Sequence, residues 1–210
     1  MATKQDYFDA AFDMLSAEGY SALKQAPLCK RLNVTTGSFY HYFQNWHDFT
    51  SQLLDHWLAD RTTRLVGLTG DQDDPLEQLE TLLEFALALP HRAEAAIRVW
   101  SRVDPEVGAV QERVDRSRTE VVLRAARAVF DDEREALARA HSAMYLLAGF
   151  QELDPGGDTA TLEWALRRLL REFAEQHAAR TGRAPAGRIG GEPPARNAPA
   201  EDDYLRGHGA

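Results

Sequence analysis

The stretch of sequence that decides the fold runs over residues 20–49 and reads YSALKQAPLCKRLNVTTGSFYHYFQNWHDF. Proline is tolerated in a helix only within the first turn, so Pro27 predicts the start of a short helix. Asn33 follows that helix, and asparagine accepts a left-handed backbone conformation more readily than most residues. Thr35 is suited to cap a second helix. The stretch therefore predicts two short helices joined by a tight turn.

The second helix begins with small residues and continues into aromatic ones. Thr36, Gly37 and Ser38 occupy its exposed start, where bulk would hold a helix away from base edges in the major groove. Tyr40 and His41 follow, and their hydroxyl and ring N–H groups are suited to contact phosphates. The pattern predicts a DNA-recognition helix, although Tyr40 and His41 would be ordinary surface residues in an arbitrary helix.

The residues around this helix are expected to be structural. Phe39 and Phe43 share one helical face and are predicted to pack inward, as aromatic pairs at this spacing usually do. Cys29 lies on the apolar face of the first short helix and is interpreted as a core residue rather than a nucleophile. Asn45 and Asp48 have the spacing of a capping box, which predicts that a long helix begins here.

The segment from Leu28 to Phe43 resembles the helix-turn-helix signature of the TetR family of transcriptional regulators. The resemblance is specific over the first quarter of the chain and extends to the remainder only in length and helicity. It implies a homodimer that binds a pseudo-palindromic DNA operator, usually as a repressor, and is released by a small molecule bound to the C-terminal domain. Carried over by position, the predicted DNA-binding residues are Lys24, Thr35, Thr36, Gly37, Ser38, Tyr40, His41 and His47.

Two positions depart from the family pattern. Asn33 occupies a corner where the family commonly has glycine, and asparagine is acceptable there. Trp46 occupies the start of the long helix, where the family usually has a lysine that contacts a phosphate. One charge-assisted contact is therefore missing, and His47 is the candidate to replace it.

Composition and charge set the conditions for DNA binding and localisation. The formal net charge is −9, and residues 1–66 contain six cations and seven anions, so DNA binding would depend on individually placed contacts rather than a positive field. No apolar run is long enough for a membrane span, and the N-terminus has no signal-like core. With a single cysteine, the sequence predicts a cytoplasmic protein without an internal disulfide.

The apolar periodicity is helical throughout, and it predicts an all-α fold of about nine helices. An N-terminal three-helix helix-turn-helix domain would precede a C-terminal helical ligand-binding and dimerisation domain. The Asp-Pro pairs at 74–75 and 104–105 predict helix starts. The expected helices cover residues 5–18, 26–32, 36–42, 46–68, 75–89, 91–102, 105–129, 132–153 and 159–179. The expected domains are 1–46, which binds DNA, 47–180, which binds ligand and dimerises, and 181–210, a disordered tail rich in proline and glycine.

The C-terminal domain is expected to contain an effector pocket and a dimer interface. Large side chains with one polar atom favour Trp57 and Trp100 as pocket residues, although most candidates could equally be plain core. The candidate pocket residues are Trp57, Phe85, Trp100, Val103, Val122, Tyr145 and Gln151. The candidate interface residues on the last two helices are Met144, Leu147, Leu162, Leu166, Leu169 and Phe173.

Catalytic and metal-binding functions are not favoured. Apart from a loose pair of His91 and Glu94, the seven histidines form no cluster with metal-ligand spacing, and the sequence has neither a glycine-rich phosphate loop nor a nucleophile elbow. No metal, cofactor or enzyme activity is expected. Two functions remain: a DNA-binding repressor that responds to a small apolar or aromatic effector, or a helical homodimer that binds a small molecule or protein partner with little DNA affinity.

Overall fold

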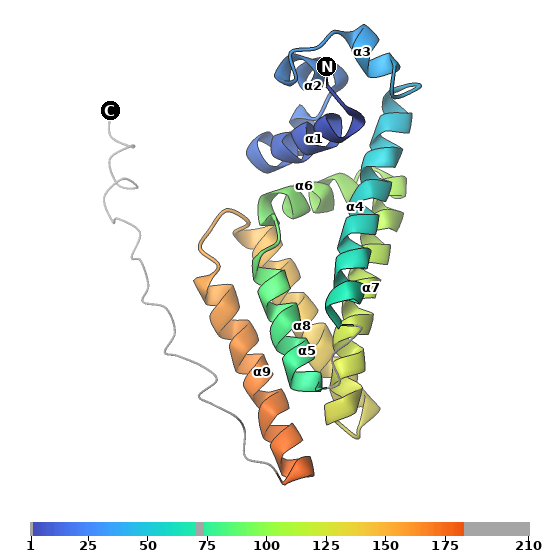
Figure 1. The fold of residues 1–210 in the computed structure, drawn as a ribbon. Helices are drawn as coiled ribbons and strands as arrows, with labels where there is room; N and C mark the ends of the chain where they lie inside the picture. The colour runs from blue at the N-terminus through green and yellow to red at the C-terminus, as the bar shows by residue number, and fades with distance from the viewer. Residues whose placement is uncertain (1, 70–73, 183–210) are drawn as a thin grey trace, which may run out of the picture.

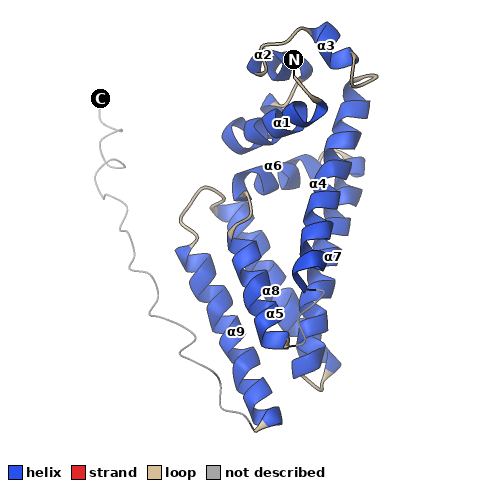
Figure 2. Cartoon of the chain, in the orientation of Figure 1, coloured by secondary structure: helices blue, strands red, loops and turns tan. Residues whose placement is uncertain are grey.

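The computed structural model describes residues 2–69 and 74–182 of the 210-residue chain. Within these ranges the chain forms α-helices, one short 3₁₀ helix and no strand (Figures 1 and 2), which confirms the predicted all-α class. The elements are α1 (Lys4–Glu18), η1 (Tyr20–Ala22), α2 (Gln25–Arg31), α3 (Thr36–Tyr40), α4 (Trp46–Thr69), α5 (Pro75–Leu87), α6 (His91–Ser101), α7 (Pro105–Val129), α8 (Glu133–Leu153) and α9 (Ala160–Thr181).

The helices form a small head above a longer bundle. Helices α1, α2 and α3 make up the head, and α4 runs from the head along α7 into the bundle (Figure 1). Helix α6 lies directly against α1, whereas α5, α7, α8 and α9 pack together below it. The head therefore rests on α6 and continues into the bundle through α4.

Helix starts follow the local sequence signals. Asp74 and Asp104 accept hydrogen bonds from the first backbone N–H groups of α5 and α7, as the Asp-Pro pairs predict. Thr3 and Asp6 form a complete capping box at the start of α1. Gly19 ends α1 with a φ of 78°, a conformation that favours glycine.

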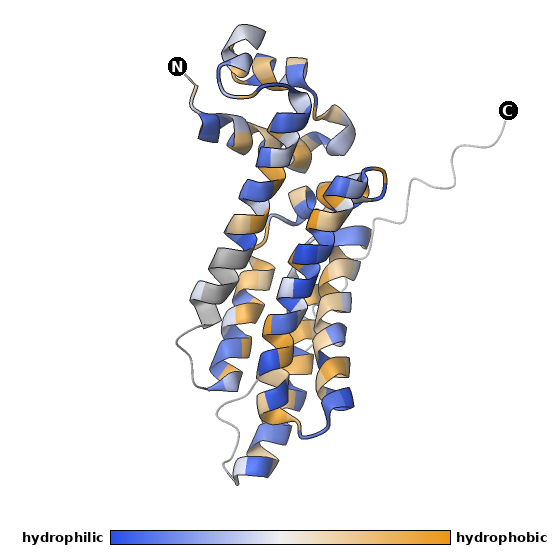
Figure 3. Cartoon of the chain, turned by 90° about the vertical axis from the view of Figure 1, so that its right-hand side faces the viewer, coloured by the Kyte–Doolittle hydropathy of each residue, from blue (hydrophilic) through white to orange (hydrophobic). Residues whose placement is uncertain are grey.

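The buried apolar side chains of the described residues form two clusters. The first joins the head to α4, α6 and the start of α7, and the second lies among α5, α7, α8 and α9. Hydrophobic and hydrophilic residues alternate along the helices of the bundle, as expected for amphipathic helices (Figure 3). The head thus shares a continuous core with α6, and the predicted domain boundary after residue 46 stays a prediction.

The predicted helix ends differ slightly from those observed. Helix α3 ends at Tyr40, two residues before the expected end. Beyond this end, the hydroxyl of Tyr42 donates a hydrogen bond to the carbonyl oxygen of Ala2 at 2.9 Å. Helix α9 continues to Thr181, where Gly182 ends it with a φ of 65°. The rest of the predicted disordered tail, residues 183–210, lies outside the described residues.

Candidate DNA interface and helical cavity

The turn between α2 and α3 has the geometry that the sequence predicts. Asn33 adopts a φ of 52°, the one positive value among described residues other than glycine. The Val34 N–H donates to the carbonyl of Cys29 at 3.0 Å and closes the turn. Thr35 caps α3 by accepting from the Ser38 N–H at 3.2 Å. The corner thereby sets the direction in which α3 leaves the head.

One side of α3 is buried and the other faces solvent. Phe39 is fully buried, whereas Thr36, Gly37 and His41 are exposed and Tyr40 is 56% exposed. Ser38 is half-buried. The predicted contact residues therefore form one accessible surface, which we call the α3 face and define as Thr35–Ser38, Tyr40 and His41.

The α3 face is backed by an aromatic core. Phe39 contacts Tyr7 edge-on, with ring centroids 5.9 Å apart, and Phe43 contacts Phe49 at 4.9 Å. Trp46 is half-buried and stacks near Phe39 at 6.1 Å, so the residue that replaces the family lysine is a packing residue. Rigid aromatic packing holds α3 in place beneath its exposed side.

Three further residues bear on the head's chemistry. Lys24 is exposed at the start of α2, which leaves its ammonium group accessible. The His47 side chain is 70% exposed, and its Nδ1 lies 3.7 Å from a carboxylate oxygen of Glu106. Burial raises the pKa of the Cys29 thiol, which keeps it protonated and agrees with a packing role.

An apolar cavity lies within the second cluster, between α5 and the three last helices. Its volume is about 80 Å³, well below the several hundred Å³ usual for a ligand pocket. Among the described lining residues, Arg118 is the only charged one. The lining residues are Leu79, Leu82, Leu83, Phe85, Ala86, Leu89, Arg118, Val122, Ala143, Leu147, Leu166, Leu169, Leu170 and Phe173.

Phe85 and Val122 of the predicted pocket residues line this cavity, and the other five lie elsewhere. Trp100 is buried beneath the head, where it stacks on Tyr20 with centroids 5.1 Å apart. Val103 and Tyr145 are 67% and 71% exposed. The remaining two, Trp57 and Gln151, belong to a buried polar network.

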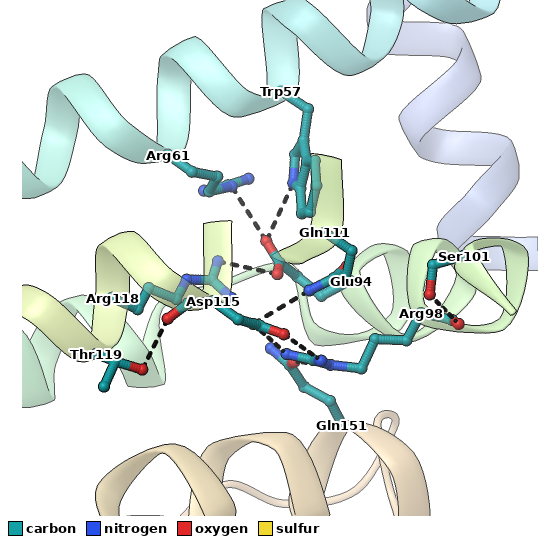
Figure 4. A network of polar contacts seen from close by, with 10 residues as sticks. All are labelled: Trp57, Arg61, Glu94, Arg98, Ser101, Gln111, Asp115, Arg118, Thr119 and Gln151. Atoms are coloured by element: carbon teal, nitrogen blue, oxygen red, sulfur yellow. Dashed lines mark hydrogen bonds and ion pairs between the residues drawn. The ribbon is translucent and has the colours of Figure 1, made fainter. Parts of the chain in front are cut away.

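That network connects α4, α6, α7 and α8 (Figure 4). Glu94 of α6 is its centre: one oxygen accepts from the Trp57 indole N–H at 3.3 Å and lies 3.1 Å from Arg61, and the other accepts from Arg118 at 2.9 Å. Gln151 accepts from Arg98 at 3.1 Å.

Sequence reasoning missed the charged members of this network. Neither Glu94 nor Arg118 is among the site residues predicted from the sequence, yet their side chains are 1% and 4% exposed. The signal that could have found Arg118 is its place in a core repeat along α7, whose buried members are Val107, Gln111, Val114, Arg118, Val121 and Ala125. A charge at such a position needs a buried partner.

The predicted dimer residues all face the interior of a single chain. Met144, Leu147, Leu162, Leu166 and Phe173 are buried, and Leu169 lines the cavity. The outward side of α8 instead exposes Leu137, Tyr145 and Leu153, at 38%, 71% and 87%. The inward faces of α8 and α9 therefore build the core, and their other faces are available to a partner.

Two kinds of feature are absent from the described residues. No helix there is both long enough and apolar enough to cross a membrane. No group of three or more histidine, cysteine, aspartate or glutamate side chains in this part of the chain is arranged to hold a metal ion.

Comparisons with known proteins agree with the described geometry. Residues 8–47 match the family model for bacterial regulatory proteins of the tetR family. The fold resembles a transcriptional regulator from Rhodococcus sp. Rha1, with a TM-score of 0.69, 17% identity, and coverage of 83% of this chain and 97% of that one. No curated protein matches the sequence.

Two similar structures were solved with ligands. A regulator from Saccharomonospora viridis in complex with choline has a TM-score of 0.66 and 17% identity, with coverage of 82% of this chain and 95% of that chain. FadR from Bacillus subtilis, in complex with stearoyl-CoA, has a TM-score of 0.60 and 15% identity, with coverage of 81% and 97%. At these identities the likeness concerns the fold.

Proposed function

We propose that this chain is a cytoplasmic repressor of the TetR family of bacterial regulators and that it binds a pseudo-palindromic operator as a homodimer. The observation that carries the proposal is the α3 face: small residues and two polar aromatic side chains lie exposed on a helix that is capped, turned outward and backed by buried rings. Such a helix can enter the major groove with its N-terminal end.

The proposal gives different roles to the residues of the α3 face. Thr36 and Gly37 lie at the exposed start, where base edges would be nearest. Tyr40 and His41 lie further along and would contact phosphates. Lys24 adds a cation beside them, whereas His47 would have to turn from Glu106 to reach a phosphate.

A homodimer is proposed to form through the outward faces of α8 and α9. The inward faces of both helices are buried in the core of one chain, whereas Tyr145 and Leu153 remain exposed on α8. Two-fold pairing would place two copies of α3 about 34 Å apart, one turn of DNA, or a multiple of that distance.

The effector is proposed to bind the apolar cavity and to release the DNA. A ligand must widen the cavity, because about 80 Å³ is too small for most effectors. The similar structures with choline and stearoyl-CoA support the idea that this fold accommodates ligands of different sizes. Widening the space between α5 and α9 would also strain their packing on α7, which contacts α4.

Fluorescence anisotropy with a labelled duplex from the upstream intergenic region, at two salt concentrations, tests DNA binding. We expect saturable binding that weakens with salt and that a scrambled duplex does not displace. In the double variant Tyr40→Ala, His41→Ala, DNA affinity should fall while Tm stays unchanged, because both side chains are exposed. A folded dimer that binds no promoter fragment would overturn the proposal.

The near-neutral head and Trp46 favour a second candidate, a helical dimer that binds a small molecule without useful DNA affinity. The same titration separates the two functions. Ligand binding in the absence of any specific duplex binding would support this second candidate.

A further inference from the structure

Arg118 combines burial with incomplete pairing. Its side chain is 4% exposed, and in the described part of the chain only Nη2 has a partner, Glu94 at 2.9 Å. Nε and Nη1 are buried without a hydrogen-bond partner. They hold three of the five N–H groups of a guanidinium, and buried donors of this kind are expensive to leave unpaired.

The charge around Arg118 is also incompletely balanced. Glu94 is 1% exposed and is shared by Arg118, Arg61 and the Trp57 indole. Arg61 has a second carboxylate, Asp60, at 3.5 Å, whereas among the described residues Arg118 shares Glu94 and has no other carboxylate partner. The local arrangement therefore favours an additional anion at Arg118.

Arg98 shows what a satisfied arginine looks like in the same network. Its two Nη atoms each donate to an oxygen of Asp115 at 2.8 Å, and its Nε donates to Gln151 at 3.1 Å (Figure 4). Arg98 does not line the cavity, but Arg118 does. Of these two arginines, the incompletely paired one is thus the one that reaches the apolar space.

We propose that the cavity binds a small apolar monocarboxylate. The carboxylate accepts hydrogen bonds from Nη1 or Nε of Arg118, and the hydrocarbon body lies among the leucines of α5 and α9 together with Phe85 and Phe173. The inference rests on the proposed function and specifies the chemical class of its effector. Charge-assisted pairing with an arginine gives the site its preference for an acid over a neutral analogue.

The cavity volume limits the size of the ligand. About 80 Å³ is roughly half of the ~150 Å³ that holds benzene in an engineered apolar cavity. Even a short chain or a single ring must therefore push α5 and α9 apart. Octanoate and cyclohexanecarboxylate are suitable probes, with 1-octanol and cyclohexanemethanol as neutral analogues.

The position of Arg118 also connects the ligand with the head. A bound carboxylate shares the guanidinium with Glu94 and weakens the attraction between them, and Glu94 is the residue that holds Trp57 and Arg61 of α4 against α6. Helix α4 begins six residues after α3 ends, and α6 packs against α1. Loosening the contacts between α4 and α6 shifts the two helices that support the head. This movement is a physical route for the release of DNA.

The test is isothermal titration calorimetry of the full chain, without DNA, with each acid and its neutral analogue. We expect the acids to bind about tenfold or more tighter than the alcohols, the range for one hydrogen bond to a charged group. Arg118→Gln should remove this preference. Arg98→Gln, the matched control, should retain it, and Ala143→Leu should weaken acid and alcohol alike by filling the cavity.

Equal binding of acid and alcohol by the natural protein, no binding of either, or an unchanged preference in Arg118→Gln would each overturn the proposal. If Arg118→Gln does not fold, the proposal is tested by the carboxyl pKa of bound octanoate. This pKa is measured by nuclear magnetic resonance of ¹³C-carboxyl octanoate bound to the natural protein. Its carboxyl pKa should lie below that of the free acid, and an unshifted or raised pKa contradicts pairing with Arg118.

The DNA titration separates this inference from the proposed function. Acid-selective binding by a chain that binds no promoter would support the cavity assignment and refute the repressor. Specific DNA binding without acid selectivity would support the repressor and refute the cavity assignment.

Discussion

Gly37 lies at the exposed start of α3, and nothing in the fold requires glycine there. Its φ is not positive, and a Cβ at this position would meet only the Thr35 hydroxyl oxygen, at an ordinary 3.5 Å. Glycine is nevertheless the poorest helix former apart from proline. Under the proposed function, its small size would let a base edge or phosphate approach the start of α3 closely.

Gly37→Ala should separate folding from DNA binding. The substitution is expected to raise the free energy of unfolding, by up to about 1 kcal/mol, because alanine restricts the unfolded chain and favours helix. DNA affinity should fall, because the new methyl group holds α3 off the groove. Urea denaturation and fluorescence anisotropy measure the two effects. Gly67→Ala on α4, where a Cβ would meet no neighbour, is the control that should leave DNA affinity unchanged.

His91 provides a second test at the scale of one residue. Burial lowers its pKa, and nearby Arg118 lowers it too, while the nearby backbone of Leu87 and the charge of Glu94 act in the opposite direction. The unfolded chain therefore binds a proton at a higher pH than the folded chain. Stability should be complete above the unfolded pKa, about 6.5, and should decrease as the pH falls below it.

The prediction for His91 is checked by urea denaturation at pH 7.5 and 5.5. His91→Gln should reduce the loss of stability between these two values. An equal loss in the variant would assign the pH dependence to other groups. Three carboxylates have lowered pKa values and affect the stability at a lower pH than His91, because their stabilising contacts are lost only as they become protonated. These are Asp6, Asp48 and Glu133.

At the scale of an element, the helix starts are the features most directly encoded. Asp104 accepts from the Glu106 N–H at 3.0 Å and from the Val107 N–H at 3.5 Å, and Pro105 has no N–H to satisfy. Helix α7 contributes to both hydrophobic clusters and carries Arg118. The residue at which α7 starts therefore determines which of its side chains face the cavity. A weakened cap should therefore lower the stability of the whole chain.

Asp104→Ala is expected to lower the free energy of unfolding by about 1 kcal/mol, the usual value for an N-cap. Asp104→Ser should restore most of the loss, because serine also accepts from these N–H groups. Chemical denaturation of the three proteins measures the difference. If serine were no better than alanine, capping would not be the source of the effect.

At the scale of the whole molecule, the outward face of α8 is the surface most suited to a second copy of the chain. Tyr145 is 71% exposed and stacks on His141, with centroids 5.9 Å apart. Leu153 lies further along the same helix and is 87% exposed. Large exposed side chains of this kind are typical of interface residues.

Tyr145→Glu should convert the proposed dimer into a monomer and weaken operator binding, because a charge would be buried at the interface. Val103→Glu is the matched control, since Val103 is 67% exposed but lies after α6. Sedimentation velocity measures the oligomeric state. A Tyr145→Glu protein that remains dimeric would place the interface elsewhere.

The sequence by itself determined the features that depend on neighbouring residues. Pro27, Asn33 and Thr35 act within one or two turns of chain, so the two short helices and their corner could be predicted and are found in the structure. The Asp-Pro pairs and the helical apolar period located the remaining helices for the same reason. The match of residues 8–47 to the family model covers this locally encoded region.

Only the tertiary structure decided what depends on distant residues. The cavity is built by four helices, and Trp57 and Trp100 proved to lie outside it because α6 brings them against other partners. The apolar faces of α8 and α9 point into the core, and this orientation likewise follows from the packing of the two helices on α5 and α7. Arg118 and Glu94 meet across 24 positions of sequence, and their pairing is set by helix packing rather than by local pattern.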